Sequence, residues 1–346
     1  MTGPGRPRRA HLGAALALVL AFGCGGGDGP AAIDAAPGDG PGADAPACDP
    51  DRPRATAPTV AVGPATLEDR VVALVDGATV AIDVQMYSFT LTRLADRLIA
   101  ADRRGVPVRV LLDAGQPENA TIRSRLVAGG VEVRDAPAAF INAHAKYVVI
   151  DRDDALIASG NFTVAGLSDQ RNYGVEDRDP EDVADLATLF EADWTGTTPA
   201  LTCSRLVVTP GDARLRIQTL IASATTSLDL ALYYLSDTSI RAALQTAHNR
   251  GIAVRVLLAD PSEIADNAAT ATTLTQTGIS VKTLRNPTMH AKVIVADGAR
   301  ALVGSNNMSI TSMRDNREVG VILREPPAVA TVTTQFAADW AAATAW

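Results

Sequence analysis

Two short runs of this chain carry the same residue types at the same spacing, and both could act on a phosphate ester. Each run reads His-x-Lys-x4-Asp and is followed by a Ser and an Asn. The residues are His144, Lys146, Asp151, Ser159 and Asn161 in the first run and His290, Lys292, Asp297, Ser305 and Asn307 in the second. An imidazole is a competent nucleophile or proton donor near neutral pH, and Lys, Ser and Asn can bind the oxygens of a phosphate-sized anion. The two runs therefore predict a phosphate-binding catalytic site.

The rarity of lysine and histidine strengthens this prediction. The chain has 31 Lys and Arg together, but its lysines are only Lys146, Lys282 and Lys292, and it has four His. Residues two apart on a strand point to the same face, so each His and its Lys project together. A single His on a strand is usually structural, but two equivalent His-x-Lys pairs favour a functional site. His248 and Lys282 have no such neighbours, and we predict that they lie on the surface.

The chain repeats itself at a spacing of 146 residues. Residues 104–112 (RGVPVRVLL) match residues 250–258 (RGIAVRVLL), and the two motif histidines keep the same spacing. Further pairs that keep it are Tyr87 and Tyr233, Gly174 and Gly320, Phe190 and Phe336, and Trp194 and Trp340. Such self-similarity predicts two halves of one fold, at residues 58–199 and 200–346.

Strand and helix patterns alternate within each half. Apolar runs typical of strands cover residues 80–87, 106–112 and 146–150, and again 227–234, 252–258 and 292–296. Helical periodicity covers residues 91–104 and 238–250, and a last helix ends near the Trp of each half. We therefore expect an α/β fold with two pseudo-symmetric halves, each a mixed β-sheet flanked by helices.

The two motifs resemble the duplicated His-x-Lys-x4-Asp-x6-Gly-Ser-x-Asn pattern of the phospholipase D superfamily. The resemblance covers essentially all of residues 58–346, and Ala158 in place of the first Gly is the main departure within the motifs. It implies one active site at the interface of the halves and a covalent phosphohistidine intermediate. It implies no metal or other cofactor. A single chain with both motifs is expected to act as a monomer.

The resemblance also points to side chains that orient the histidines. Glu318 fits the carboxylate that the family uses for this purpose, and its repeat partner is Asn172. If each supports the histidine of its own half, His290 is the better general acid and His144 the nucleophile, because a carboxylate favours a protonated imidazole. Asp151 and Asp297 belong to the family motif, but at strand ends they could instead fix the turn geometry.

Three functions remain open on the sequence alone. The first is a phospholipase D that hydrolyses phospholipid headgroups or transfers them to alcohols. The second is an exported nuclease with the same chemistry, and the third is a non-catalytic phosphate-binding module. The net charge of −8 and the aromatic content of 4% count against nucleic acid, which binds basic surfaces and stacks on aromatic rings. Intact motifs in both halves count against the third.

The first 57 residues indicate export. Three arginines precede an apolar stretch at residues 12–23, which is typical of a signal peptide, and Cys24 follows in a lipobox-like run. We expect a lipid anchor on Cys24 that holds the chain at a bacterial membrane, in the periplasm or at the cell surface. Secretion is the alternative if the lipobox is not used. Residues 25–57 read as a disordered linker with a reach of roughly 30 Å. Cys48 and Cys203 could form a disulfide or remain two unpaired thiols.

Overall fold

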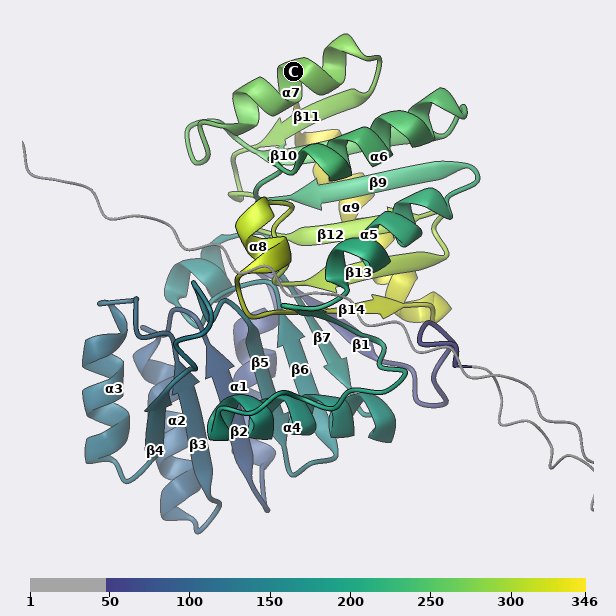
Figure 1. Cartoon of the computed structure of the whole chain (residues 1–346). Coiled ribbons are helices and arrows are strands. Elements are labelled where there is room, and N and C mark those ends of the chain that lie inside the picture. Colours follow the sequence, from purple (N-terminus) through teal and green to yellow (C-terminus); the bar gives the residue numbers. More distant parts are fainter. Residues whose placement is uncertain (1–47) are drawn as a thin grey trace, which may run out of the picture. The chain divides into compact units, whose positions relative to one another are not determined.

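The computed structural model describes residues 48–346 (Figure 1). The predicted signal peptide, the lipidation site at Cys24 and residues 25–47 of the predicted linker lie outside this range. Within residues 48–346, no helix combines the length and the apolar character needed to cross a membrane.

The first half builds a seven-stranded mixed sheet with the order β1-β7-β6-β5-β2-β3-β4. Its elements are β1 (Thr59–Val62), α1 (Leu67–Gly77), β2 (Ile82–Met86), α2 (Thr92–Arg103), β3 (Val108–Leu112), α3 (Asn119–Ala128), β4 (Glu132–Asp135), β5 (Lys146–Ile150), β6 (Asp154–Ala158), the π-helix η1 (Ala165–Asp169), β7 (Tyr173–Asp177) and α4 (Pro180–Thr195). Strands β2, β3 and β4 are parallel, whereas β5 pairs antiparallel with β2.

The second half repeats this arrangement in an eight-stranded sheet with the order β15-β11-β10-β9-β12-β13-β14-β8. Its elements are β8 (Leu206–Thr209), α5 (Ala213–Ala222), β9 (Ser227–Leu232), α6 (Thr238–Asn249), β10 (Ala253–Ala259), α7 (Asn267–Gln276), β11 (Ser280–Leu284), β12 (Lys292–Ala296), β13 (Arg300–Gly304), α8 (Ile310–Arg314), β14 (Glu318–Leu323), α9 (Pro326–Ala342) and β15 (Thr344–Ala345). The predicted α/β fold of two similar halves, each a mixed sheet with helices, is thereby confirmed.

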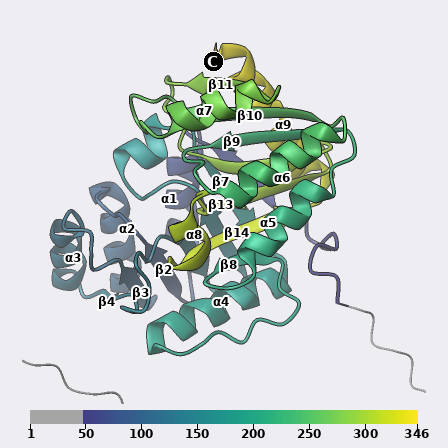
Figure 2. The same cartoon turned by 45° about the horizontal axis from the view of Figure 1, so that its top comes forward.

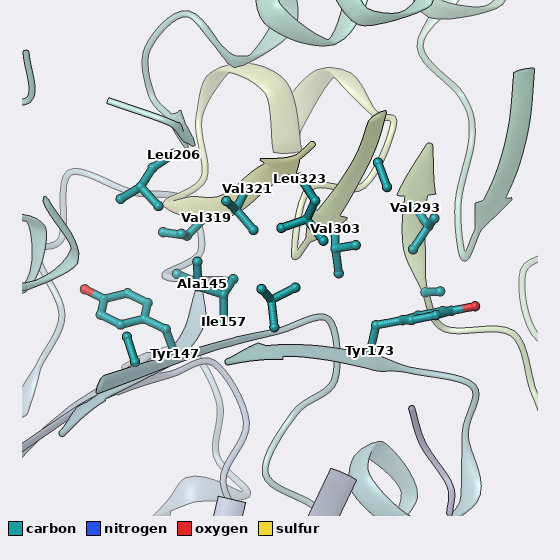
Figure 3. Close-up of a cluster of buried hydrophobic side chains, with 14 of the residues drawn as sticks. Ala145, Tyr147, Ile157, Tyr173, Leu206, Val293, Val303, Val319, Val321 and Leu323 are labelled. Atoms are coloured by element: carbon teal, nitrogen blue, oxygen red, sulfur yellow. The ribbon is translucent and has the colours of Figure 1, made fainter. Parts of the chain in front are cut away.

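The two sheets pack against each other, and this contact forms one hydrophobic core shared by both halves. Strands β6 and β7 lie against β13, and β5 and β6 lie against β14. Figure 3 shows Tyr147 and Ile157 of the first sheet facing Val319 and Val321 of the second. Strands buried on both faces read as continuous apolar runs, which explains the sequence of β5. Its Tyr147 faces the other half, while its neighbour Val148 packs with the helices of its own half.

Helix α4 closes the first half and connects it to the second. Asp179 caps its first turn by accepting a hydrogen bond from the backbone N–H of Glu181, and Pro180 occupies the first helical position. Gly196 ends the helix in the left-handed conformation with φ 71°. Figure 2 shows α4 below β8, so the helix of one half contacts a strand of the other.

Residues 48–57 are attached to the folded body, which corrects the predicted linker boundary at residue 57. Cys48 forms a disulfide with Cys203. Arg54 is 6% exposed, and its guanidinium binds the Asp182 carboxylate at 2.8 Å while its backbone N–H donates to Glu325 at 2.7 Å. The composition of this segment predicted disorder because it is poor in apolar residues, yet ion pairs and a disulfide hold it.

Candidate active site

The two motif histidines lie just before strands β5 and β12, where the halves meet. Two isolated β-bridges join the halves at this point, one between Ala143 and Arg317 and one between Arg171 and Met289. In the first bridge, Ala143 directly precedes His144 and Arg317 directly precedes Glu318. In the second, Met289 directly precedes His290 and Arg171 directly precedes Asn172. The bridges therefore bring His144 next to Glu318 and His290 next to Asn172.

Glu318 is a fully buried carboxylate that holds His144. Its Oε2 lies 2.7 Å from His144 Nδ1 and accepts a hydrogen bond from Ser305 Oγ at 2.6 Å. Its Oε1 accepts from Ser312 Oγ at 2.8 Å and from Asn316 Nδ2 at 3.1 Å. Burial by itself would raise the pKa of Glu318, but the interactions with His144, Lys146 and Ser305 outweigh it and hold the pKa below its ordinary value. Glu318 is therefore an ionised acceptor that fixes the orientation of the His144 ring.

Asn172 has the equivalent position beside His290, but it is neutral. Its Oδ1 lies 3.0 Å from His290 Nδ1 and accepts a hydrogen bond from Ser159 Oγ at 2.8 Å. Its Nδ2 donates to the backbone oxygen of Gly166 at 2.9 Å, which fixes the direction of the amide. His290 thus has an oriented acceptor on Nδ1 but no charge to stabilise its protonated form.

The supports therefore cross the interface, and the expectation that each supports its own half was wrong. The repeat shows that Glu318 and Asn172 are equivalent, but equivalence between halves does not say which histidine a side chain reaches. The packing of the two sheets decides this, because the β-bridge at Arg317 leads into β14 beside the first-half histidine.

The two histidines consequently differ in pKa. Burial lowers the pKa of His144, and Glu318 offsets part of this effect. Burial lowers the pKa of His290 well below its ordinary value, and the neighbouring charges of Lys292 and Lys146 lower it further. His144 is therefore the more easily protonated ring in the free site.

Both motif lysines are buried beside the histidines. Lys146 Nζ donates to the backbone oxygen of His144, and Lys292 Nζ donates to the backbone oxygen of His290 at 2.6 Å. Burial lowers the pKa of Lys146 to about 7 and lowers the pKa of Lys292 well below its ordinary value. A cation that is costly to bury gains from an anionic ligand, so both lysines are suited to bind a phosphate oxygen.

The motif Ser and Asn residues separate into two groups. Ser159 and Ser305 were predicted to bind phosphate, but they are fully buried and their hydroxyls donate to Asn172 and Glu318. They position the residues that orient the histidines. Within residues 48–346, Asn161 and Asn307 each have a buried side-chain oxygen without a hydrogen-bond partner, so an acceptor on each amide remains available to a donor group of a ligand. Phosphate binding by their amide N–H groups stays a prediction.

Asp151 and Asp297 do not reach the site, which corrects their assignment as catalytic residues. They follow the far ends of β5 and β12, roughly 20 Å of strand away from the motif histidines. Asp297 accepts hydrogen bonds from the backbone N–H groups of Thr225, Thr226 and Ser227. Asp151 does the same with the equivalent loop at residues 79–81. Their role is structural, which was one of the two readings of the sequence.

Two tyrosines that the sequence marked only as repeat-related also line the site. The Tyr87 ring lies 4.7 Å from the His144 ring, and the Tyr233 ring lies 4.4 Å from the His290 ring, measured between centroids. Each also lies 5.1 Å from the Nζ of its half's motif lysine. Their conserved spacing within the chain was the available signal. It was missed because each tyrosine stands at the end of an apolar strand and reads as a core residue.

Comparison with known proteins supports the same assignment. A family model described as "Cardiolipin synthase, PLD-like domain" matches residues 71–194 and again residues 217–340. The probable cardiolipin synthase YwiE of Bacillus subtilis (strain 168) is 26% identical over 304 residues, which are 75% of this chain and 61% of that protein. The mitochondrial cardiolipin hydrolase of Danio rerio is 30% identical over 124 residues, which are 35% of this chain and 54% of that protein.

A solved structure shares the architecture of both halves. The phosphatidylserine synthase of Haemophilus influenzae Rd KW20 superposes with a TM-score of 0.65 at 12% identity, covering 80% of this chain and 84% of the other. At this identity the likeness shows the fold alone. The family model, by contrast, matches well over half of the sequence and places one copy of the domain in each half. The chain therefore belongs to the phospholipase D superfamily and contains its PLD-like domain twice.

Proposed function

We propose that this protein is a phosphodiesterase that works through a phosphohistidine intermediate. The observation that carries the proposal is the pair of histidines from opposite halves, each bound through Nδ1 to an oriented acceptor. An Nδ1 fixed in this way leaves Nε2 as the nitrogen that faces a substrate. Two such nitrogens beside two buried lysines suit an in-line displacement at phosphorus.

His144 is assigned as the nucleophile, although the reason given by the sequence was wrong. As Nε2 attacks phosphorus, positive charge grows on the ring, and the interaction with Glu318 becomes stronger towards the transition state. If His144 were the acid, its positive charge would fall as the proton left, and the same interaction would weaken. Only interactions that strengthen towards the transition state accelerate a reaction. The carboxylate is therefore most effective beside the nucleophile.

The two steps balance with His290 as acid and then as base. In the first, the bond from His144 Nε2 to phosphorus forms, the bond to the leaving alcohol oxygen breaks, and protonated His290 donates a proton to that oxygen. In the second, His290 takes a proton from water, the water oxygen bonds to phosphorus, and the phosphorus–nitrogen bond breaks. The low pKa of His290 makes it a strong acid, and a bound phosphodiester anion offsets the lysine charges that oppose its protonation.

Phospholipid is the substrate class that these observations favour. The relatives reported above are named as a cardiolipin synthase and a cardiolipin hydrolase. Carboxylates also lie near the tyrosines of the site. Burial raises the pKa of Tyr87, and Asp113 and Glu118 raise it further, while burial and then Glu263 raise the pKa of Tyr233. Negative charge near these tyrosines disfavours a polyanion such as DNA more than a single lipid phosphodiester. Either water or an alcohol could receive the phosphatidyl group, which distinguishes hydrolysis from transfer.

A substrate competition tests the proposal. The full chain is incubated with mixed phospholipid vesicles and, separately, with plasmid DNA, and loss of each substrate is followed by mass spectrometry and by gel. We expect headgroup release from lipid, abolished in His144→Ala, with an exchange product when glycerol is added if transfer occurs. Cleavage of DNA alone would replace the lipid proposal with the nuclease alternative. Consumption of neither, nor of bis(nitrophenyl) phosphate, would leave a phosphate-binding module.

A further inference from the structure

Three exposed aliphatic side chains lie close to the active-site motifs along the chain. Ile141 is three residues before His144, Val164 is three residues after Asn161, and Ile310 is three residues after Asn307. Their exposed fractions are 65%, 56% and 51%. Single exposed aliphatic residues are ordinary on protein surfaces. Three beside one site, from three separate segments, are a pattern that folding alone does not account for.

The structure places two of these residues at one corner of the interface. The backbone N–H of Ile141, from the first half, donates to the backbone oxygen of Asp315 at 3.0 Å. Asp315 directly follows α8, the short helix that begins with Ile310. Figure 1 shows α8 beside the ends of β12 and β13, where the two halves meet. Ile141 and Ile310 therefore come from different halves but border the same part of the site.

The third residue extends the pattern to the other half. Val164 and Ile310 are separated by 146 residues, so they are equivalent in the repeat. Val164 directly precedes η1, as Ile310 begins α8, and both follow the Asn whose amide oxygen is available for a ligand. Because the histidine pair lies between two halves related by the repeat, the symmetry assigns Val164 to the opposite side of the pair from Ile310.

We propose that Ile141, Val164 and Ile310 form a docking rim that inserts into the surface of a phospholipid bilayer. The inference rests on the proposed function, since it concerns how the site reaches a lipid. The phosphodiester of a bilayer lipid lies at the headgroup level, just outside the acyl chains. Aliphatic side chains on both sides of a phosphate-binding site would reach the acyl boundary when the site reaches the phosphate.

The chain offers a matched control for this proposal. Val80, Val127 and Leu215 are aliphatic residues with exposed fractions of 61%, 56% and 65%, and they lie away from the motif residues in the sequence. We therefore compare the rim variant I141S/V164S/I310S with the control variant V80S/V127S/L215S. All proteins are full chains with Cys24→Ser, so that no variant carries a lipid and all share the same N-terminal segment.

Two measurements separate docking from chemistry. Co-flotation with phosphatidylcholine/phosphatidylglycerol vesicles measures binding, and hydrolysis of bis(nitrophenyl) phosphate measures the site without a bilayer. We expect the rim variant to lose at least about tenfold in vesicle binding, as three buried aliphatic side chains would contribute, and to keep its rate on the soluble diester within about twofold. The control variant should match the parent in both assays.

The possible failures are distinguishable. Equal vesicle binding by the rim and control variants would overturn the docking rim, while lipid cleavage by the parent would still support the proposed function. Parent chains that bind vesicles through the rim but release no headgroup would keep the rim and refute the lipid activity. If the rim variant loses the soluble activity as well, single Ile310→Ser and Val164→Ser variants repeat the binding assay. If neither single variant loses vesicle binding, the docking rim is refuted.

Discussion

At the scale of single residues, the supports of the two histidines differ by one charge. Glu318 and Asn172 are equivalent in the repeat and hold His144 and His290 through similar hydrogen bonds of 2.7 and 3.0 Å. The carboxylate stabilises a positive ring, and the amide only orients one. The site is therefore built symmetrically in geometry and asymmetrically in electrostatics.

Removing the charge of Glu318 should slow the reaction and move its pH profile. We expect Glu318→Gln to lower kcat/KM by about 10²- to 10³-fold, comparable with the loss of one preorganised electrostatic contact. Without the carboxylate, which raises the pKa of His144, that pKa falls further. With a nitrophenyl diester, whose leaving group needs no proton, the rate follows the neutral fraction of His144, so the acid-side limb of the kcat/KM profile should move to lower pH. The profile is measured with a soluble diester.

The matched control for this variant is Glu176→Gln. Glu176 is a nearly buried carboxylate on β7 that pairs with Arg70 rather than with a histidine. The Glu176→Gln variant should keep both the kcat/KM and the pH profile of the parent. An acid limb that does not move in Glu318→Gln would contradict the electrostatic role and leave only a positioning role for Glu318.

The covalent intermediate distinguishes the two histidines directly. With a nitrophenyl diester, whose leaving group needs no proton, His290→Ala should still accumulate phosphorus on His144. His144→Ala should accumulate none. Rapid quench followed by peptide mass spectrometry identifies the modified residue. Phosphorus on His290 in the His144→Ala protein would reverse the assignment.

Residue types and spacing predicted the reactive groups, and the family resemblance pointed to Glu318 and Asn172 as their supports, but neither showed which histidine each support reaches. The His-x-Lys pairs are visible because the chain uses so little lysine. Glu318 and Asn172 each support the histidine of the other half because of how the two sheets pack, and no local sequence pattern encodes this packing. Ser159 and Ser305 were misassigned because a hydroxyl can bind either a ligand or a neighbouring polar side chain. Only the structure shows that each donates to the supporting residue 13 positions further along its own half.

At the scale of elements, the last residue of each motif shapes a turn. Asp151 and Asp297 adopt φ angles of 56° and 55°, a left-handed conformation that Asp and Asn tolerate better than most residues. Each carboxylate binds three consecutive backbone N–H groups of the loop that leads into the neighbouring strand. These contacts tie the end of β5 to the start of β2 and the end of β12 to the start of β9.

Asp297→Asn should therefore affect stability and not chemistry. Asn keeps the backbone conformation but loses the charge, and we expect a loss of about 1–3 kcal/mol in the free energy of unfolding. Burial opposes ionisation of Asp297, but the donors of residues 225–227 outweigh it and depress its pKa. The stabilisation is therefore present above the unfolded pKa and is lost as pH falls. The difference between the two proteins, measured by denaturant titration, should narrow below about pH 4.

Asp151→Asn changes the equivalent residue of the first half and should lower the free energy of unfolding by a similar amount. Activity per folded molecule should stay within about twofold of the parent in both variants. A large loss of activity with unchanged stability would restore these residues to the catalytic machinery.

The elements were largely predictable because the same hydrophobic periodicity occurs once in each half of the chain. Strands β5 and β12 begin at the predicted lysines, and the last long helices contain the predicted tryptophans. The order of strands in each sheet and the packing of β6 against β13 and β14 depend on contacts between distant segments, which periodicity does not report. The attachment of residues 48–57 was missed because its ion pairs lie more than 100 residues away.

At the scale of the whole molecule, the described body begins at a disulfide between the N-terminal segment and the second half. Cys48 is bonded to Cys203, and Asp51 pairs with Arg216 at 2.6 Å. Any anchor upstream would therefore act on the folded body at this point. The proposed lipid anchor at Cys24 would leave 23 residues between the membrane and Cys48.

Cys24→Ser tests the anchor. The variant should move from the membrane fraction to the soluble fraction after a high-salt wash, because a single polar substitution removes the acyl chains. Its rate on a soluble diester should equal that of the parent. Immunoblotting of the fractions measures the shift. A variant that stays with the membrane through the wash would contradict the lipoprotein proposal.

The crossed supports also bear on how a duplicated chain can change. Each half holds the residue that supports the other half's histidine, so a mutation at position 318 alters the chemistry of a motif 174 positions upstream. The two copies are therefore not free to diverge one at a time. A histidine and its support are inherited in different copies, and an exchange of one half with a relative would separate them. A change in the chemistry of this site therefore involves both halves together.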